Sequence, residues 1–315
     1  MCRKFVPVAI IGVLAMAATM MGREAEDSGD SMVGKKPFGQ HKTDSGSSTP
    51  QILWHGGPVL GIAGSVTLYV IYYGSNWPST TQPLINAFLG GLSGTPQFNV
   101  NKTYCEKSTT ACSASDSPFG GLLGYNVDAT HVFHDAAVQG NTVNSSGISK
   151  ILQYALVTAP GHLPLDFNGI YMLVTDPTIN VPGFGTSFCA YHTRSNVAGN
   201  DIKWALIPEP DSKGASCDGN IANGQTVTPN GDAGADEMID SIMHELSETV
   251  SDPDLNAWYT SNGSENGDLC DYNYGTWASL PEASNGAKYN AAWGGHHWLI
   301  QLIWKNTVTA GCASQ

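Results

Sequence analysis

The chain has 315 residues, a formal net charge of −13 and only 14 Lys and Arg residues. This acidic balance argues against nucleic acid or an anionic membrane as a partner, because both attract basic proteins. Roughly 265 residues follow the N-terminal segments, which is enough for one hydrophobic core and large for two, so we expect one domain.

The first 50 residues predict two segments outside the folded domain. Residues 1–22 match a secretory signal peptide, because two basic residues precede the apolar run Phe5–Met21. An uncleaved anchor is the alternative, although no later apolar run is long enough to span a membrane. Residues 23–50 are polar and lack apolar periodicity, which is typical of a disordered linker. We therefore expect a secreted protein, free of the membrane after signal removal, with its domain at 51–315.

The domain begins with a strand and a helix. Gly64–Tyr73 is rich in β-branched and aromatic residues, which is typical of a buried strand, and Leu84–Leu92 has a short helical pattern. The remaining elements are expected in this order: a helix at Ile148–Val157, a buried strand at Asn168–Thr175, antiparallel strands at Ser187–Thr193 and Ile202–Ile207, and a closing strand at Trp293–Trp304. We predict an α/β or α+β fold in which a mixed β-sheet packs against one long amphipathic helix.

That long helix should start after Asp232, a plausible N-cap, and stop near Ser251, because Pro253 pushes the residue before it out of the α region. Its apolar positions gather within about a third of the circumference. They are Ile239, Ile242, Met243, Leu246 and Val250. This face should pack on the core.

The opposite face carries Asp240, His244 and Glu248 one turn apart. The segment H-E-L-S-E at 244–248 differs by one residue from the zinc-protease pattern H-E-x-x-H, in which ligands at i and i+4 meet one cation and the intervening Glu polarises a bound water. His244 and Glu248 are therefore candidate ligands and Glu245 a candidate general base. The candidates for a third ligand are the downstream acids Asp252, Asp254, Asp268 and Asp271. The alternative is an exposed amphipathic surface helix whose polar face carries a histidine.

The number of cysteines is consistent with an exported protein. Apart from Cys2, six remain, and an even number in a secreted chain predicts three disulfides. The nearest-neighbour pairing is Cys105–Cys112, Cys189–Cys217 and Cys270–Cys312, one of 15 possible connectivities. Sequons at Asn101, Asn144 and Asn262 are candidate glycosylation sites. His192, a lone histidine on a predicted strand, is expected to be structural.

Several stretches carry a family resemblance. They are W-H-G-G-P-V-L at 54–60, F-C-A-Y-H at 188–192, and P-N-G-D-A-G-A-D-E-M-I-D-S-I-M-H-E-L-S-E at 229–248, followed by N-A-W-Y, G-D-L-C and a final Q-x-x-W strand. Over about residues 51–313 the chain resembles the Exordium or phosphate-induced protein family of secreted plant cell-wall proteins, which has microbial relatives. The resemblance implies an extracellular or wall-associated protein without a settled catalytic activity. The family's H-E-L-x-E and D-L-C motifs make Asp268 the preferred third ligand over Asp252 and Asp254.

Three functions remain open. The first is a zincin-like metalloprotein, and in one form a hydrolase of extracellular peptides, with zinc on His244, Glu248 and Asp268 and with Glu245 as base. The second is a non-catalytic protein that binds cell-wall polysaccharide. Its stacking faces would be Trp258, Tyr259, Tyr272, Tyr274 and Trp277. The alternative is that these rings pack the core. The third is a structural calcium site in the acidic loop.

Overall fold

The computed structural model of the protein describes residues 34–40, 52–62, 64–107, 112, 116, 118–122, 128–210 and 216–315. The predicted signal peptide, residues 1–22, and most of the predicted linker, residues 23–50, lie outside these ranges. Within the linker, residues 34–40 do not fit the prediction of disorder, because the Lys35 side chain is buried in the fold. The folded part therefore includes a segment that its polar composition did not indicate.

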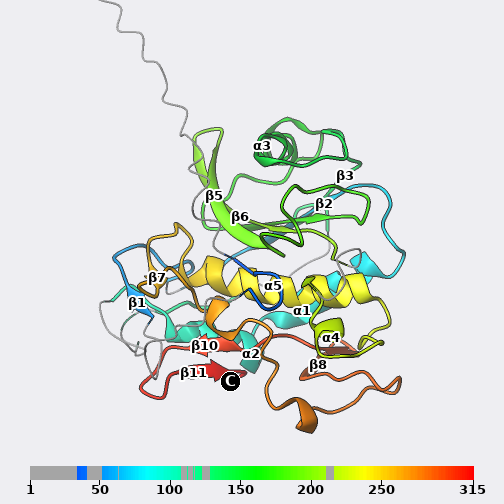
Figure 1. Ribbon diagram of the computed structural model, residues 1–315. Coiled ribbons are helices and arrows are strands. Elements are labelled where there is room, and N and C mark those ends of the chain that lie inside the picture. The colour runs from blue at the N-terminus through cyan, green and yellow to red at the C-terminus, as the bar shows by residue number, and fades with distance from the viewer. Residues whose placement is uncertain are drawn as a thin grey trace, which may run out of the picture. The chain divides into compact units, whose positions relative to one another are not determined.

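A five-stranded mixed sheet has the strand order β3-β2-β4-β6-β5 (Figure 1). Its strands are β2 (Leu68–Tyr73), β3 (Val132–Asp135), β4 (Ile170–Thr175), β5 (Tyr191–Val197) and β6 (Asn200–Ile207). Neighbouring strands are parallel except for β5 and β6, which are antiparallel as predicted. The strands β2 and β4 correspond to the two predicted buried strands, and the α/β class with a mixed sheet is confirmed.

The helix α5 (Ala233–Ser251) lies against this sheet (Figure 1). As predicted, Asp232 caps its N-terminus, and the carboxylate accepts a hydrogen bond from the Ala235 N–H. The alternative of an exposed surface helix is wrong, because every residue from 234 to 251 is buried. Other segments must therefore cover and neutralise the polar side of the helix.

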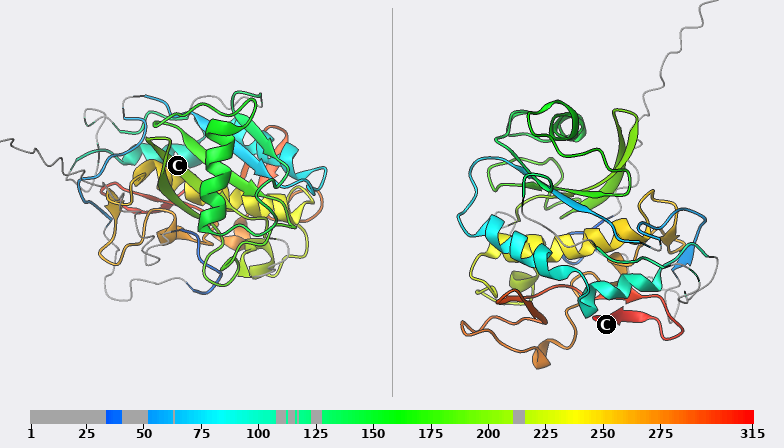
Figure 2. Two further views of the ribbon diagram at one scale, coloured as in Figure 1. Left: turned by 90° about the horizontal axis from the view of Figure 1, so that it is seen from above. Right: turned by 180° about the vertical axis from the view of Figure 1, so that it is seen from behind.

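Helices cover both faces of the sheet (Figure 2). Because successive side chains of a strand point to opposite faces, Val70 of β2 belongs to the core that contains α5 and α1 (Thr81–Leu92). The next residue, Ile71, belongs to the core under α3 (Ser145–Gln153) and the π-helical turn η3 (Tyr154–Thr158) that continues it. The two predicted helices in this part of the chain, at 84–92 and 148–157, are confirmed.

The single closing strand predicted at Trp293–Trp304 is wrong. The segment contains β8 (Ala291–Trp293), β9 (His296–Trp298) and β10 (Ile303–Lys305). Gly294 and Gly295 have φ angles of 64° and 81°, a left-handed backbone that glycine adopts freely, and they turn the chain between the antiparallel strands β8 and β9. Before β10, the Gln301 N–H donates to Asp240 Oδ1 at 2.6 Å, which fixes the chain to α5 instead of to another strand.

The remaining elements are short. They are β1 (Leu53–Trp54), α2 (Pro96–Asn99), η1 (Val100–Thr103), α4 (Gly219–Ala222), β7 (Trp258–Tyr259), η5 (Asp268–Cys270), η6 (Trp277–Ser279) and β11 (Gly311–Ala313). The strand β1 pairs with β7, and β10 pairs with β11. Within the described residues, no helix has the length and apolar character needed to cross a bilayer.

All three nearest-neighbour disulfides are confirmed. Cys105 bonds to Cys112, Cys189 to Cys217, and Cys270 to Cys312. The third bond adjoins a predicted metal ligand, because Cys270 ends the helical turn η5 that begins at Asp268. It ties this turn to the C-terminal strand β11, which contains Cys312.

The three sequons differ in exposure. Asn144 and Asn262 are exposed, and glycosylation at these positions stays a prediction. Asn101 is buried, and its side-chain amide donates to Ser247 Oγ of α5 at 3.2 Å. A glycan on that nitrogen has no room in this fold, so the predicted modification of Asn101 is incompatible with the folded structure.

Removing the third disulfide should cost more stability than removing the first. In the chain-entropy account, a closed loop of 42 residues contributes about 4 kcal/mol, whereas a loop of 7 residues contributes about 2 kcal/mol. We expect Cys270→Ser with Cys312→Ser to lower the free energy of unfolding by the larger amount, measured by denaturant titration. The matched control is Cys105→Ser with Cys112→Ser, and a larger loss in that control would contradict the prediction.

Candidate metal centre

The polar side of α5 is buried and forms the centre of the candidate site. His244, Glu245 and Glu248 are each 0% exposed. Placing several ionisable side chains in one buried region is costly unless they pair with one another or bind a cation. Their partners come from segments far away in the sequence, namely β5, the loop around η5, and residues 34–40.

The turn η5 brings Asp268 to His244 and Glu248. His244 Nε2 lies 3.0 Å from Glu248 Oε1 and 3.8 Å from Asp268 Oδ1. One ligand atom from each of the three residues lies within 4.8 Å of the others. Tetrahedral zinc bonds of about 2.0–2.1 Å separate ligand atoms by roughly 3.4 Å. The three residues chosen as ligands from the sequence thus lie together at a spacing that suits zinc.

A glutamine fixes the His244 ring. His244 Nδ1 lies 2.9 Å from Gln301 Oε1, which also accepts a hydrogen bond from Lys35 Nζ at 3.1 Å. Since an ammonium can only donate, the amide atom facing both groups is an oxygen and His244 Nδ1 carries a hydrogen. Gln301 Nε2 donates to the Gly267 carbonyl at 2.8 Å, which holds the amide in this orientation. Nε2 of His244 is left to face the carboxylates, as in histidines that bind metals.

A second histidine, His192 of β5, which was expected to be structural, lies in the same region. Its Nδ1 is 3.4 Å from Glu245 Oε2 and 3.4 Å from Glu248 Oε2. These three residues form a second group whose ligand atoms lie within 4.8 Å of one another. His192 is therefore not an isolated structural histidine. No spacing in the sequence connects it to α5, because the contact depends on how β5 is placed beside the helix.

Burial and charge act in opposite directions on these groups. Burial would lower the pKa of His192, but the adjacent carboxylates of Glu245 and Glu248 raise it to about 10. Burial would also lower the pKa of His244, and Glu248 foremost raises it to about 10. Burial, followed by the charge of Glu248, raises the pKa of Glu265 well above its ordinary value. The region therefore has a strong preference for positive charge at the two imidazoles.

The other acids proposed as third ligands are engaged elsewhere. Asp252 Oδ1 accepts hydrogen bonds from the backbone N–H groups of Asn256 and Ala257, each at 2.6 Å. Asp254 Oδ1 forms an ion pair with Lys203 Nζ at 2.9 Å. These contacts stabilise the turn after α5 and attach it to β6. They favour Asp268 as the third ligand.

Lys35 closes the polar side of α5. Its ammonium donates to Asp240 Oδ2 at 2.7 Å and to Asp271 Oδ1 at 3.1 Å, and lies 4.2 Å from the centre of the Tyr272 ring. Its backbone N–H donates to Glu245 Oε1 at 3.0 Å. Burial would lower the pKa of Lys35, but Asp240 and Asp271 raise it well above its ordinary value. Residues 34–40, dark blue in Figure 1, thus supply a cation that the acids require.

Both oxygens of the Glu245 carboxylate face other side chains or backbone groups in this structure. One of its oxygens accepts from Lys35, and the other lies beside His192. It does not belong to the group formed by His244, Glu248 and Asp268. Its role as a general base stays a prediction.

The five aromatic rings considered for glycan stacking do not form an exposed row. Trp258 is 0% exposed, and Tyr272 and Tyr274 are also buried. The Trp258 indole N–H donates to the Cys105 carbonyl at 2.9 Å, so this ring packs the core. Tyr259, which is half-buried, stacks on His55. The alternative, in which the rings pack the interior, holds for Trp258, Tyr272 and Tyr274.

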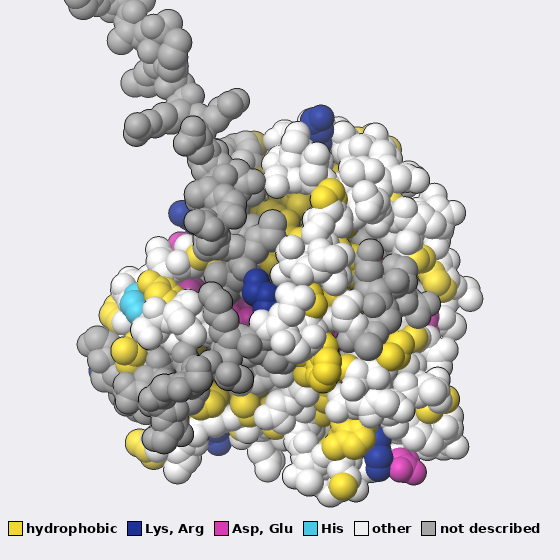
Figure 3. All heavy atoms as spheres, in the orientation of Figure 1, with side chains coloured by type: hydrophobic (Ala, Val, Ile, Leu, Met, Phe, Trp, Pro, Cys, Tyr) yellow, Lys and Arg dark blue, Asp and Glu magenta, His cyan; other side chains and the backbone are white. Residues whose placement is uncertain are grey.

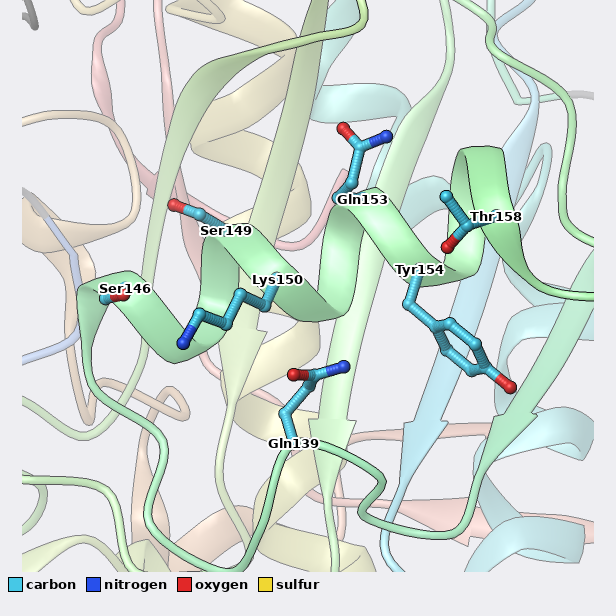
Figure 4. A pocket seen from close by; sticks show the side chains of 7 residues that line it. All are labelled: Gln139, Ser146, Ser149, Lys150, Gln153, Tyr154 and Thr158. Atoms are coloured by element: carbon cyan, nitrogen blue, oxygen red, sulfur yellow. The ribbon is translucent and has the colours of Figure 1, made fainter.

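A hollow of about 370 Å³ lies on the outer side of α3 (Figure 4). It is lined by Gln139, Ser146, Ser149, Lys150, Gln153, Tyr154 and Thr158. The sheet separates it from the metal-ligand candidates, because α3 and α5 pack on opposite faces. The residues that line it have polar side chains, one of them a cation, and none of the seven is a histidine, a cysteine or an acid. The molecular face in Figure 3 likewise carries scattered charges, without a broad patch of one sign among the described residues.

Comparisons with known proteins agree on one family. A conserved region described as "Phosphate-induced protein 1 conserved region" matches residues 52–315. Protein EXORDIUM-like 5 of Arabidopsis thaliana is 27% identical over 299 residues, which cover 85% of this chain and 79% of that protein. Protein EXORDIUM-like 3 of the same plant is 25% identical over 293 residues, covering 85% of this chain and 84% of that protein. No solved structure was found to match.

Replacing Lys35 should strongly destabilise the fold. The variant Lys35→Met leaves the buried carboxylates of Asp240 and Asp271 without their ammonium, and loss of one partner of a buried ion pair costs roughly 3–5 kcal/mol. The free energy of unfolding should fall by that amount in denaturant titrations. Lys150→Met, at an exposed position, is the control and should change it by less than about 0.5 kcal/mol. Equal effects of the two variants would show that Lys35 does not neutralise these acids.

Proposed function

Since the chain belongs to the phosphate-induced protein 1 family, we propose that it is an exported metalloprotein of hydrolase type, with zinc held by His244, Glu248 and Asp268. One observation carries this proposal. His244 Nε2 is completely buried and faces two carboxylates, yet it has no hydrogen-bond partner among the described residues.

The rival explanation is a protonated His244 that pairs with Glu248. An imidazolium would direct its N–H at a carboxylate oxygen. The Nε2 to Oε1 distance of 3.0 Å is short enough for a hydrogen bond, but the direction of the ring nitrogen is not suitable for one. A cation placed between the ring and the carboxylates satisfies all three groups at once. The oriented Gln301 behind the ring supports the same assignment.

The donor set favours zinc over calcium. Calcium prefers six to eight oxygen ligands in a flexible shell. An imidazole nitrogen with two carboxylates at close spacing suits zinc or a similar first-row cation. The calcium alternative is therefore the weaker one for this group.

The number of ligands supports a hydrolase instead of a purely structural metal. Structural zinc sites are closed by four protein ligands, whereas catalytic sites have three and keep one position for water or substrate. Asp268 is the ligand that keeps partial exposure, 15% for its side chain, and so marks the side from which a substrate can approach. Lys35 lies across Glu245, whose Oε1 accepts a hydrogen bond from the Lys35 N–H.

Export is supported by three disulfides, which persist in oxidising compartments. The matched relatives from Arabidopsis are named EXORDIUM-like proteins. We accordingly propose an extracellular location, with an extracellular peptide as the substrate class. Binding of cell-wall polysaccharide is the less supported function, because Trp258, Tyr272 and Tyr274 are buried.

Metal analysis tests the proposal directly. The purified full chain should contain zinc, and His244→Ala should lose at least one ion per chain, measured by mass spectrometry of the elements after dialysis. His162→Ala changes an exposed histidine outside the site and should leave the metal content unchanged. A metal-free wild-type chain that does not take up added zinc would refute the proposed function.

A glycine offers a second, steric test. A Cβ atom at Gly267 would lie 2.8 Å from Glu248 Oε1 and 3.0 Å from the His244 ring, so Gly267→Ala must displace at least one ligand. We expect zinc affinity to fall roughly 10- to 100-fold, the range seen when groups that orient metal ligands are altered. Gly90→Ala on α1 meets no atom within 4 Å and serves as the control. Unchanged affinity in Gly267→Ala would place the metal elsewhere.

A further inference from the structure

The Glu248 carboxylate has two sides that face different histidines. Oε1 lies 3.0 Å from His244 Nε2 and accepts a hydrogen bond from the Asp268 N–H at 3.0 Å. Oε2 lies 3.4 Å from His192 Nδ1 and has no hydrogen-bond partner among the described residues. A carboxylate placed in this way can bind one cation with each oxygen.

The orientation of His192 matches that of a ligand. Its Nε2 lies 3.3 Å from the Asp252 carbonyl, which can only accept, so Nε2 carries the hydrogen. Nδ1 then faces Glu245 and Glu248. It makes no hydrogen bond in the part of the chain that the structure describes, although both carboxylates are 3.4 Å away. The same arrangement, with a far nitrogen donating to a fixed acceptor, is present in His244.

Glu245 supplies the third atom. Its Oε1 accepts from the Lys35 N–H, whereas Oε2 has no hydrogen-bond partner within the described ranges. Three atoms of three completely buried side chains, His192 Nδ1, Glu245 Oε2 and Glu248 Oε2, therefore face one another without hydrogen bonds. Their separations of 3.4 Å from the imidazole nitrogen equal the roughly 3.4 Å between ligands of a tetrahedral first-row cation.

We infer that a second divalent cation binds His192, Glu245 and Glu248, so that the Glu248 carboxylate bridges two metal ions. The inference rests on the proposed function, because Glu248 is shared with the ion at His244 and Asp268. Imidazole and carboxylate donors suit zinc or manganese at this position. Paired metal ions about 3.5–4 Å apart occur in hydrolases of phosphate esters and peptides, where they bind the attacking and leaving oxygens. Glu245 acts in this centre as a ligand and not as a base.

The number of bound ions separates this inference from the proposed function. The zinc-loaded full chain should contain two ions, and His192→Ala should retain one, measured by elemental analysis after dialysis. Glu245→Gln keeps the size of the side chain and an acceptor for the Lys35 N–H, and it should also retain one. Circular dichroism melting checks that both variants fold. His162→Ala should keep two ions.

Manganese provides a readout that a structural role of His192 would not change. Two Mn²⁺ ions bridged by Glu248 are magnetically coupled, so the loaded wild-type chain should give a coupled electron paramagnetic resonance spectrum. The Glu245→Gln variant should give the spectrum of an isolated ion. One ion per chain in the wild type, lost in His244→Ala but kept in His192→Ala, would overturn the second site and leave the proposed function standing. No bound ion in the wild type would overturn both.

Discussion

Neutralising the buried acids of α5 is the constraint on which the rest of the structure depends. The helix carries Asp240, Glu245 and Glu248 in a region that water does not reach. Isolated buried carboxylates would cost more free energy than a typical domain has to spare. The fold answers with an ammonium from Lys35 at one end of the polar row, and in the proposed form with metal cations held between the carboxylates and the imidazoles further along it. The ammonium and the imidazoles come from residues 34–40, from β5 and from α5 itself.

This requirement explains why distant segments meet at one helix. His192 comes from the antiparallel strand of the sheet, and Asp268 from a turn tied down by the disulfide of Cys270. Gln301 bridges Lys35 and His244 through one amide oxygen. His192, Asp268 and Gln301 each contact a side chain of α5. Binding of the proposed metal ions should consequently be coupled to folding, since the same residues serve both.

The sequence was sufficient where the physical signal is local. The N-cap at Asp232, the length of α5 and the i, i+4 pair of His244 and Glu248 all follow from residues within one helix. The family's D-L-C motif added Asp268, which does lie beside the pair. His192 could not be found in this way, because its contact with α5 depends on the placement of β5 beside the helix.

Composition also misled in two places. The polar residues around Lys35 indicated a disordered linker. Lys35 is buried instead, because its ammonium pairs with the carboxylates of Asp240 and Asp271. The apolar run near the C-terminus indicated one strand. Two glycines with left-handed backbone and the hydrogen bond from Gln301 to Asp240 divide it instead. In both places a tertiary contact outweighed the local pattern.

The position of Lys35 also separates two boundaries that are usually taken as one. The match to the family's conserved region begins at residue 52, whereas the structural unit reaches back at least to the segment that holds this lysine. A boundary drawn at that match would separate Asp240 and Asp271 from the ammonium that pairs with them. The conserved region of the family is therefore shorter than the segment that contains both partners of the buried ion pairs.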